Sequence, residues 1–193
     1  MKSTVKIIAG NMRGRVIPFD NKKFSQADIT PQKVKGAIFS MIGEELHGKV
    51  FLDLFSGSGQ MGLEALSRWC EKAIFIEKDI ERFRFIRKEV ELTGNLERSI
   101  LYNLDYAIAL SKISKSGIKA DIVFADPPYV KSSTEVDMYK IILEKIYNSE
   151  ILKDNSVIAV QHFSKNILPE SAAGFTQKAL KKYGTTSISI YTL

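Results

Sequence analysis

The tetrad Asp126-Pro127-Pro128-Tyr129 places a carboxylate, two rigid prolines and an aromatic ring in four consecutive positions. It follows an apolar run, residues 122–125, whose length and composition predict a buried strand. The tetrad is therefore expected at the carboxyl end of a strand, the edge at which open α/β sheets bind ligands. Asp126 and the Pro127 carbonyl could accept hydrogen bonds from a planar amine, and Tyr129 could cover its ring. The chemistry indicated is a reaction on the exocyclic amino group of a base or an amide.

A glycine loop forms the second chemical cluster. Gly57, Gly59 and Gly62 follow the G-x-G-x-x-G spacing of dinucleotide-binding loops. Glu77 lies 20 residues after Gly57, where a ribose-binding acid is expected. By itself, this pattern fits NAD or FAD nearly as well as any other adenosine ligand.

Two further carboxylates favour a cationic adenosine ligand. Asp53 stands at a strand end just before the loop, where it would repel a pyrophosphate and attract a cation. S-adenosylmethionine carries both a sulfonium and an ammonium, so it fits this position. Asp105 follows another predicted strand, in a position to accept from an adenine amino group. The competing interpretation is that Asp53, Glu77 and Asp105 cap helices, and it is strong for Asp105, which directly precedes one.

Alternating strands and helices must position these residues. Apolar runs predict strands over 50–54, 72–76, 100–103, 121–125 and 157–161, and helices over 62–69, 80–92, 107–113 and 136–147. This order predicts an α/β fold with a mostly parallel sheet and helices on both faces. Residues 177–183 and 187–192 flank a tight turn and predict an antiparallel hairpin that closes a seven-stranded sheet.

The beginning of the chain is basic. The first 35 residues contain eight Lys or Arg and two Asp, which equals the net charge of +6 of the whole chain. The β-like runs 5–8 and 15–18 predict a basic hairpin, followed by a loop and by a helix that Thr30 caps. We therefore expect a basic segment, residues 1–29, that contacts a polyanion, and a catalytic domain, residues 30–193. A solvated basic terminus explains the charge equally well.

The composition excludes several classes of protein. A single cysteine, Cys70, allows no intrachain disulfide, and two distant histidines give no metal-ligand cluster. No stretch is long and apolar enough to cross a membrane. We therefore expect a cytoplasmic monomer with no metal and no membrane partner.

These motifs together resemble the bacterial 16S rRNA (guanine-N2)-methyltransferase family, within the class I, Rossmann-like methyltransferases. The resemblance covers nearly the whole chain and rests on residues 5–15, 34–39, 53–59, 62–68 and 126–129. It implies methyl transfer from S-adenosylmethionine to a guanine of 16S rRNA, within small-subunit particles. The tetrad is shared with many amino-methyltransferases, and the basic N-terminal segment narrows the resemblance to this family.

The resemblance also implies a role for each matching residue. The catalytic group is Asp126, Pro127, Pro128 and Tyr129. The cofactor-binding residues are Asp53, Phe55, Gly57, Ser58, Gly59, Glu77, Asp105 and Tyr106, and the RNA-binding residues are Lys6, Arg13, Arg15, Lys33 and Lys35. Two positions depart from the family, Asp28 where arginine is common and Gly36 where glutamate is common, and both lie near the expected substrate entrance.

Two other functions fit the residues. The first is an adenine-N6 methyltransferase acting on DNA or RNA, although 193 residues leave little room for the added region that recognises a DNA target. The second is an RNA-assembly factor that keeps the fold without catalysis. For the tetrad, the simpler explanations are a packed aromatic after a turn and a pair of strand-terminating prolines.

Overall fold

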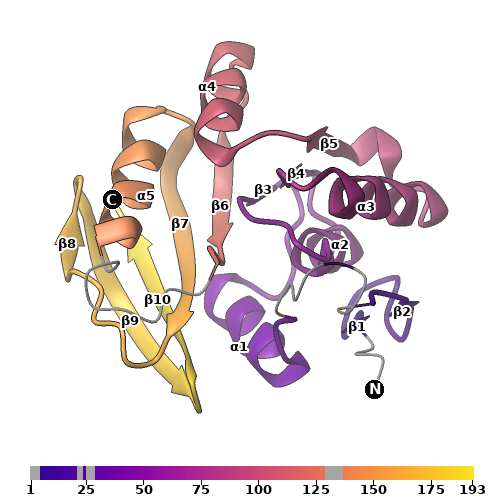
Figure 1. The fold of residues 1–193 in the computed structure, drawn as a ribbon, viewed down its shortest axis with the longest axis horizontal. Coiled ribbons are helices and arrows are strands. Elements are labelled where there is room, and N and C mark those ends of the chain that lie inside the picture. The colour runs from indigo at the N-terminus through magenta and orange to yellow at the C-terminus, as the bar shows by residue number, and fades with distance from the viewer. Residues whose placement is uncertain (1–4, 21–23, 25–28, 129–136) are drawn as a thin grey trace.

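An eight-stranded sheet divides the molecule into two layers of helices (Figure 1). The computed structural model describes residues 5–20, 24, 29–128 and 137–193. The sheet runs in the order β5-β4-β3-β6-β7-β10-β9-β8. Its parallel strands are β3 (Val50–Asp53), β4 (Lys72–Ile76), β5 (Ser99–Tyr102), β6 (Ala120–Ala125) and β7 (Leu152–Phe163). Its antiparallel strands are β8 (Ser171–Ala172), β9 (Phe175–Tyr183) and β10 (Thr186–Thr192).

Helices cover both faces of the sheet, as the βα alternation predicts. They are α1 (Gln32–Ile42), α2 (Gln60–Ser67), α3 (Ile80–Leu92), α4 (Tyr106–Ser116) and α5 (Asp137–Asn148), with a 3₁₀ turn, η1 (Leu96–Arg98). One hydrophobic core contains side chains of α1, α2 and α3, and the other contains side chains of α4 and α5. The predicted fold class, a Rossmann-like α/β sheet closed by an antiparallel hairpin, is confirmed. No helix of the described chain has the length and apolarity needed to span a membrane.

The basic N-terminal segment forms the predicted hairpin from β1 (Val5–Lys6) and β2 (Val16–Ile17). Its apolar side chains do not form a core of their own. Val5, Ile7 and Ile17 are buried in the same core as α1, α2 and α3. The predicted boundary at residue 30 is therefore not a break in packing, and the division of function that it stands for stays a prediction.

Beyond shifts of one to three residues in the bounds of other elements, the structure differs from the predicted elements in three places. The sheet gains the two-residue strand β8, which is too short to give a sequence pattern. Strand β7 begins at Leu152, five residues before the predicted start, because a bulge accommodates the polar residues 153–156. Ala120 of β6 pairs with Leu152 of β7, and Ile122 pairs with Val157, so β7 advances five positions where β6 advances two. Asn155, within this bulge, takes a positive φ of 60°. Thr30 does not cap α1; the helix begins after Pro31 without a side-chain cap.

Candidate active site

The carboxyl ends of the parallel strands surround a cavity of about 510 Å³, a volume suited to a small molecule. The structure brings the predicted glycine loop and the first three tetrad residues together in its wall. The cavity is also lined by side chains from the ends of β4 and β5 and from the first turns of α5. These lining residues include Asp53, Phe55, Gly57, Ser58, Glu77, Asp105, Tyr106, Asp126, Pro127, Pro128, Met138 and Ile142. Tyr129, predicted to stack on a base, lies outside the described residues.

The glycine loop is held in place by hydrogen bonds to strand ends. Ser56 donates its hydroxyl to the Asp53 carbonyl at 3.0 Å and accepts from the Ile76 amide at 2.9 Å, so it joins β3 to β4. Gly59 precedes α2 with a φ of 72°, a left-handed conformation that favours glycine. Gly62 has a different function: a Cβ at this position would lie 2.2 Å from the Phe75 ring. The absence of a side chain lets α2 pack directly onto β4.

Asp53 is a buried carboxylate with one unsatisfied oxygen. Its Oδ2 accepts from the Gly62 amide at 3.1 Å, and the side chain is almost fully buried. Within the described chain, Oδ1 has no hydrogen-bond partner, although Asp53 lines the cavity. Burial raises the pKa of Asp53 to about 7, the Gly62 hydrogen bond opposes the shift, and Glu77 adds to it. A cationic ligand in the cavity would stabilise the ionised form of this group.

Glu77 braces the glycine loop as well as lining the cavity. Its Oε2 accepts from the Gly57 amide at 2.9 Å, and its Oε1 accepts from the Asp79 amide at 2.8 Å. Arg82 lies 3.5 Å away from Oε1. Burial raises the pKa of Glu77, against the effect of these donors. The acid that the sequence assigned to a ribose is therefore also the anchor of the loop.

Asp105 combines the two roles that the sequence left open. It is the N-cap of α4, where its Oδ1 accepts from the Ala107 amide at 2.9 Å, so the capping interpretation is correct. It also lines the cavity, so a role toward a ligand stays a prediction. The aromatic rings of Phe55 and Tyr106 lie beside it, with centroids 5.1 Å apart, and offer a flat apolar surface.

Asp126 has a partner that the sequence did not reveal. Gln161, near the carboxyl end of β7, donates from Nε2 to Asp126 Oδ2 at 2.9 Å. Gln161 is almost completely buried, so its amide is held by the surrounding sheet. This hydrogen bond fixes the plane of the Asp126 carboxylate beside Pro127. A glutamine within a predicted strand carries no pattern that would identify it as a site residue.

The charge around the cavity is mainly negative. Its wall contains the carboxyl groups of Asp53, Glu77, Asp105 and Asp126, together with the cations Lys78 and Arg82. Arg82 is already paired with Glu77 and Asp79. This distribution disfavours a pyrophosphate and suits a cationic ligand.

The predicted RNA-binding residues fall into three groups. Lys6, Arg13 and Lys33 are exposed. Arg15 is half-buried and donates to the Leu92 carbonyl at the end of α3, so part of its guanidinium is engaged within the protein. The prediction that Lys35 binds RNA is wrong: its side chain is buried and forms a 2.9 Å ion pair with Glu64.

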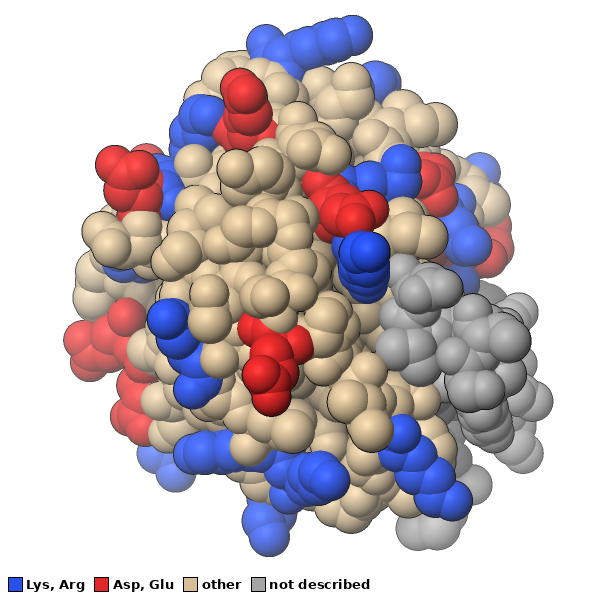
Figure 2. Space-filling view, turned by 90° about the vertical axis from the view of Figure 1, so that its left-hand side faces the viewer, with Lys and Arg blue, Asp and Glu red and all other residues tan. Residues whose placement is uncertain are grey.

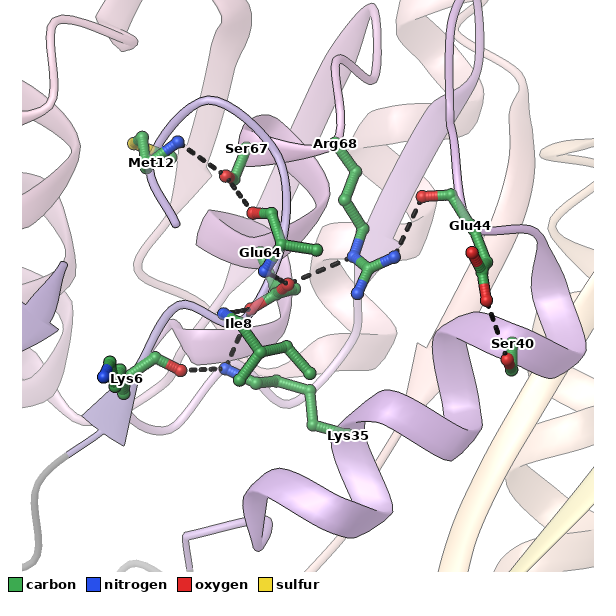
Figure 3. Close-up of polar contacts among 10 residues, drawn as sticks. Lys6, Ile8, Met12, Lys35, Ser40, Glu44, Glu64, Ser67 and Arg68 are labelled. Carbon is green, nitrogen blue, oxygen red and sulfur yellow. Dashed lines mark hydrogen bonds and ion pairs between the residues drawn. The ribbon is translucent and has the colours of Figure 1, made fainter. Parts of the chain in front are cut away.

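A buried network around Glu64 explains the position of Lys35 (Figure 3). The Glu64 carboxylate accepts from the amides of Ile8 and Ala9 at 2.9 and 3.0 Å. It also pairs with Lys35 and, at 3.1 Å, with Arg68. Burial lowers the pKa of Lys35, and the ion pair with Glu64 opposes this shift. The network fastens the N-terminal hairpin to α2, the helix that begins at the end of the glycine loop.

Comparison with known proteins gives one family and close structural relatives. A family model described as "Conserved hypothetical protein 95" matches residues 5–192. The Bacillus subtilis protein YlbH, named as a candidate rRNA methyltransferase, is 30% identical over 97% of this chain and 98% of its own. The "Ribosomal RNA small subunit methyltransferase D" of Escherichia coli is 28% identical over 97% of this chain and 89% of its own. The crystal structure of HI0767 from Haemophilus influenzae, named as a candidate methylase, aligns with a TM-score of 0.76 at 26% identity and covers 98% of both chains.

Proposed function

Because this chain belongs to the family described as Conserved hypothetical protein 95, we propose that it transfers a methyl group from S-adenosylmethionine to the N2 amino group of a guanine in 16S rRNA. The chain is an S-adenosylmethionine-dependent methyltransferase with an RNA substrate, like the curated relatives that it matches along nearly its whole length. One observation carries the proposal: Asp53, suited to a cation, and Asp126, suited to an amine, line the same cavity.

The cavity fits this cofactor. The unsatisfied Oδ1 of Asp53 is placed to attract an ammonium or sulfonium group, and Glu77 is placed to accept from ribose hydroxyls. Phe55 and Tyr106 offer their rings to an adenine, and Asp105 could accept from its amino group. When bound, the cofactor supplies an electrophilic methyl group on its sulfonium.

The residues around Asp126 would prepare the amine for attack. The lone pair of the guanine amino group is delocalised into its ring, which makes it a poor nucleophile. Hydrogen bonds from this group to Asp126 and to the Pro127 carbonyl favour a pyramidal nitrogen with its lone pair available. As positive charge develops on the nitrogen, both acceptors bind it more strongly, which stabilises the transition state. Pro127 and Pro128 restrict the backbone, and Gln161 orients the carboxylate.

Recognition of the target base completes the proposal. Tyr129 would stack on a guanine extruded from its surroundings. The exposed Lys6, Arg13 and Lys33 would bind RNA phosphates. We expect the substrate to be 16S rRNA within small-subunit particles, the protein to act as a monomer, and the reaction to take place in the cytoplasm, where ribosomal subunits are assembled.

Product mapping tests the proposal. Purified protein is incubated with methyl-labelled S-adenosylmethionine and one of three substrates: unmodified small-subunit particles, bare 16S rRNA or duplex DNA. Nuclease digestion and mass spectrometry then identify the labelled nucleoside. We expect N2-methylguanosine from one of the two ribosomal substrates. N6-methyladenosine from RNA, or its deoxynucleoside from DNA, would show an adenine-N6 enzyme, and an absence of label with all three would indicate a binding protein.

A further inference from the structure

The end of the C-terminal hairpin carries a second basic surface. Residues 164–193 contain four lysines and only one acidic residue, Glu170. Lys165, Lys181 and Lys182 are all exposed, and no carboxylate of the described chain lies within ion-pair distance of them. The net charge of the whole chain does not reveal this positive surface, because acidic residues outnumber basic ones between residues 36 and 163 and cancel its charge. We name Lys165, Lys181 and Lys182 the C-terminal lysine surface.

The strand register connects this surface to the active site. Asp126 accepts from Gln161 of β7, Gln161 pairs with Ile188 of β10, and Ile188 pairs with Lys181 of β9. The four residues therefore form one row across the sheet. With strands about 4.8 Å apart, the backbone of Lys181 lies roughly 14 Å from that of Asp126. Lys182 follows in the next row, and its side chain points to the opposite face of the sheet.

The third lysine reaches the same place through a loop. The Ser164 amide donates to the Thr185 carbonyl at 2.8 Å, so the segment that leaves β7 lies against the turn between β9 and β10. Lys165 is the next residue along this segment. Figure 2 shows Lys and Arg side chains gathered along the lower edge of this side of the molecule. In Figure 1, the turn of the β9–β10 hairpin lies at that lower edge.

The location favours RNA over another acidic partner. The carboxyl ends of β6 and β7 and the β9–β10 turn lie at the same end of the sheet, where the strands of the proposed active site also finish. The N-terminal hairpin and the C-terminal hairpin lie on opposite sides of α1 (Figure 1). An RNA strand that delivers a base to Asp126 would therefore have a basic surface on each side of the reacting nucleotide.

We propose that the C-terminal lysine surface binds phosphates of the substrate RNA on the side of the active site opposite to the N-terminal hairpin. The inference rests on the proposed function, because it takes the polyanion to be the RNA that is methylated. It adds the second half of the RNA footprint and names the lysines that form it. Lysine suits this role because its ammonium is a mobile point charge that binds phosphate without base specificity.

Two triple variants with the same change in charge test the inference. The first replaces Lys165, Lys181 and Lys182 by Gln. The control replaces Lys72, Lys112 and Lys115 by Gln. These lysines are exposed and lie toward the other end of the sheet, where the parallel strands begin. The affinity of each protein for a 16S rRNA transcript is measured between 50 and 200 mM KCl. S-adenosylmethionine affinity and melting temperature show whether each variant is folded.

Loss of phosphate contacts predicts a distinct salt dependence. The first variant should bind RNA about ten-fold or more weakly at 100 mM KCl, and its log–log salt slope should be shallower by about two. The control should keep the wild-type slope within about 0.5. Equal losses of RNA affinity in both variants, or no loss in the first variant, would overturn the inference. It would also be overturned if the first variant bound RNA normally but lost binding to an acidic protein. A wild-type protein that binds S-adenosylmethionine but never methylates rRNA would instead contradict the proposed function.

Discussion

Asp126 and Asp53 are both carboxylates at strand ends, but their surroundings give them different tasks. Asp126 is half-buried and accepts from Gln161, which fixes its orientation toward an incoming amine. Asp53 is deeply buried, and one of its oxygens has no partner in the described chain. In the proposed function, Asp126 would accept hydrogen bonds from the substrate amine, and Asp53 would be satisfied by the cationic cofactor.

The role of Asp126 predicts a loss of catalysis without a loss of cofactor binding. Asp126→Ala should lower kcat by about a thousand-fold or more, because an acceptor for the developing charge is removed. Gln161→Ala keeps the carboxylate but frees its orientation, so we expect about a ten-fold lower kcat. Isothermal titration should give the wild-type affinity for S-adenosylmethionine in both variants. An Asp126→Ala enzyme with near wild-type activity would refute the mechanism.

The raised pKa of Asp53 predicts that this residue reduces stability when no ligand is bound. With a pKa of about 7 in the folded protein and 3.8 ordinarily, the folded state holds a proton that the unfolded chain releases between these values. The free energy of unfolding therefore falls as pH rises through this window, and above pH 7 the whole destabilisation caused by the buried, ionised carboxylate remains. Asp53→Asn should make the ligand-free protein up to about 4 kcal/mol more stable at pH 8 and leave it unchanged below pH 4.

Urea unfolding across this pH range measures the effect of Asp53→Asn. The same variant should bind S-adenosylmethionine much more weakly, because it lacks the negative charge. Parallel pH profiles for the variant and the wild type would show that Asp53 is not the group responsible.

The sequence revealed individual residues where a pattern marks them. The glycine spacing and the tetrad stand out because their residue types are restricted, and the structure places Gly57 and the described tetrad residues Asp126, Pro127 and Pro128 around one cavity. Gln161 could not be identified as a partner of Asp126 in this way, and Lys35 could not be excluded from the RNA-binding residues. The hydrogen bond of Gln161 depends on strand pairing with β6, and the burial of Lys35 depends on a glutamate 29 residues away.

At the scale of elements, α2 connects the glycine loop to the N-terminal hairpin. Its N-terminus follows Gly59, and its last turns hold the hairpin through Glu64 and Ser67. The Met12 amide donates to the Ser67 hydroxyl at 2.9 Å, which adds to the contacts made by Glu64. A displacement of α2 would therefore move the glycine loop and the basic hairpin together.

Breaking this connection should be costly. Glu64→Gln leaves the buried ammonium of Lys35 without its counter-charge, so we expect a loss of about 3–5 kcal/mol in the free energy of unfolding. The double variant Glu64→Gln/Lys35→Met removes both charges of the Lys35–Glu64 pair. It leaves Arg68 without Glu64, as the single variant does, but no longer leaves the Lys35 ammonium unpaired, so it should be more stable than Glu64→Gln. Chemical denaturation of the two single variants and the double variant measures the coupling. A double variant whose loss equals the sum of the single losses would show that the pair is not coupled.

Elements were predicted well where periodicity was strong. The predicted bounds of α3 and β4 agree with the structure, because each has an uninterrupted pattern. The beginning of β7 was missed because exposed polar residues in the bulge interrupt the alternation. The first turn of α1 was misjudged for a related reason: its start is set by Pro31 and by packing on the hairpin, and a capping side chain is not needed.

The whole molecule presents two basic surfaces separated by the active site. Lys6 and Arg13 lie on the N-terminal hairpin, and Lys181 and Lys182 lie near the tip of the C-terminal hairpin. Because they are far apart and share no partner, their contributions to RNA binding should add. The arrangement would hold RNA on both sides of the nucleotide that enters the cavity.

Additivity gives a prediction at this scale. Lys6→Gln/Arg13→Gln should flatten the salt dependence of RNA binding by about one to two in log–log slope. Combined with the Lys181→Gln/Lys182→Gln pair, the loss in binding free energy should equal the sum of the separate losses within about 0.5 kcal/mol. Filter binding to a 16S rRNA transcript measures all four proteins. A combined loss much smaller than the sum would mean that both surfaces contact the same phosphates. A pair that causes no loss by itself would be shown to make no contact with the RNA.

The strand order also has a consequence for synthesis of the chain. β9 is made before β10, yet it joins the sheet only through β10, which lies between β9 and β7. Until residues 186–192 are available, β8 and β9 can pair with each other but cannot join the rest of the sheet, and the edge of β7 stays open. Open strand edges pair readily with other chains. The protein is therefore most exposed to aggregation through β7 just before β10 pairs with it and closes the sheet.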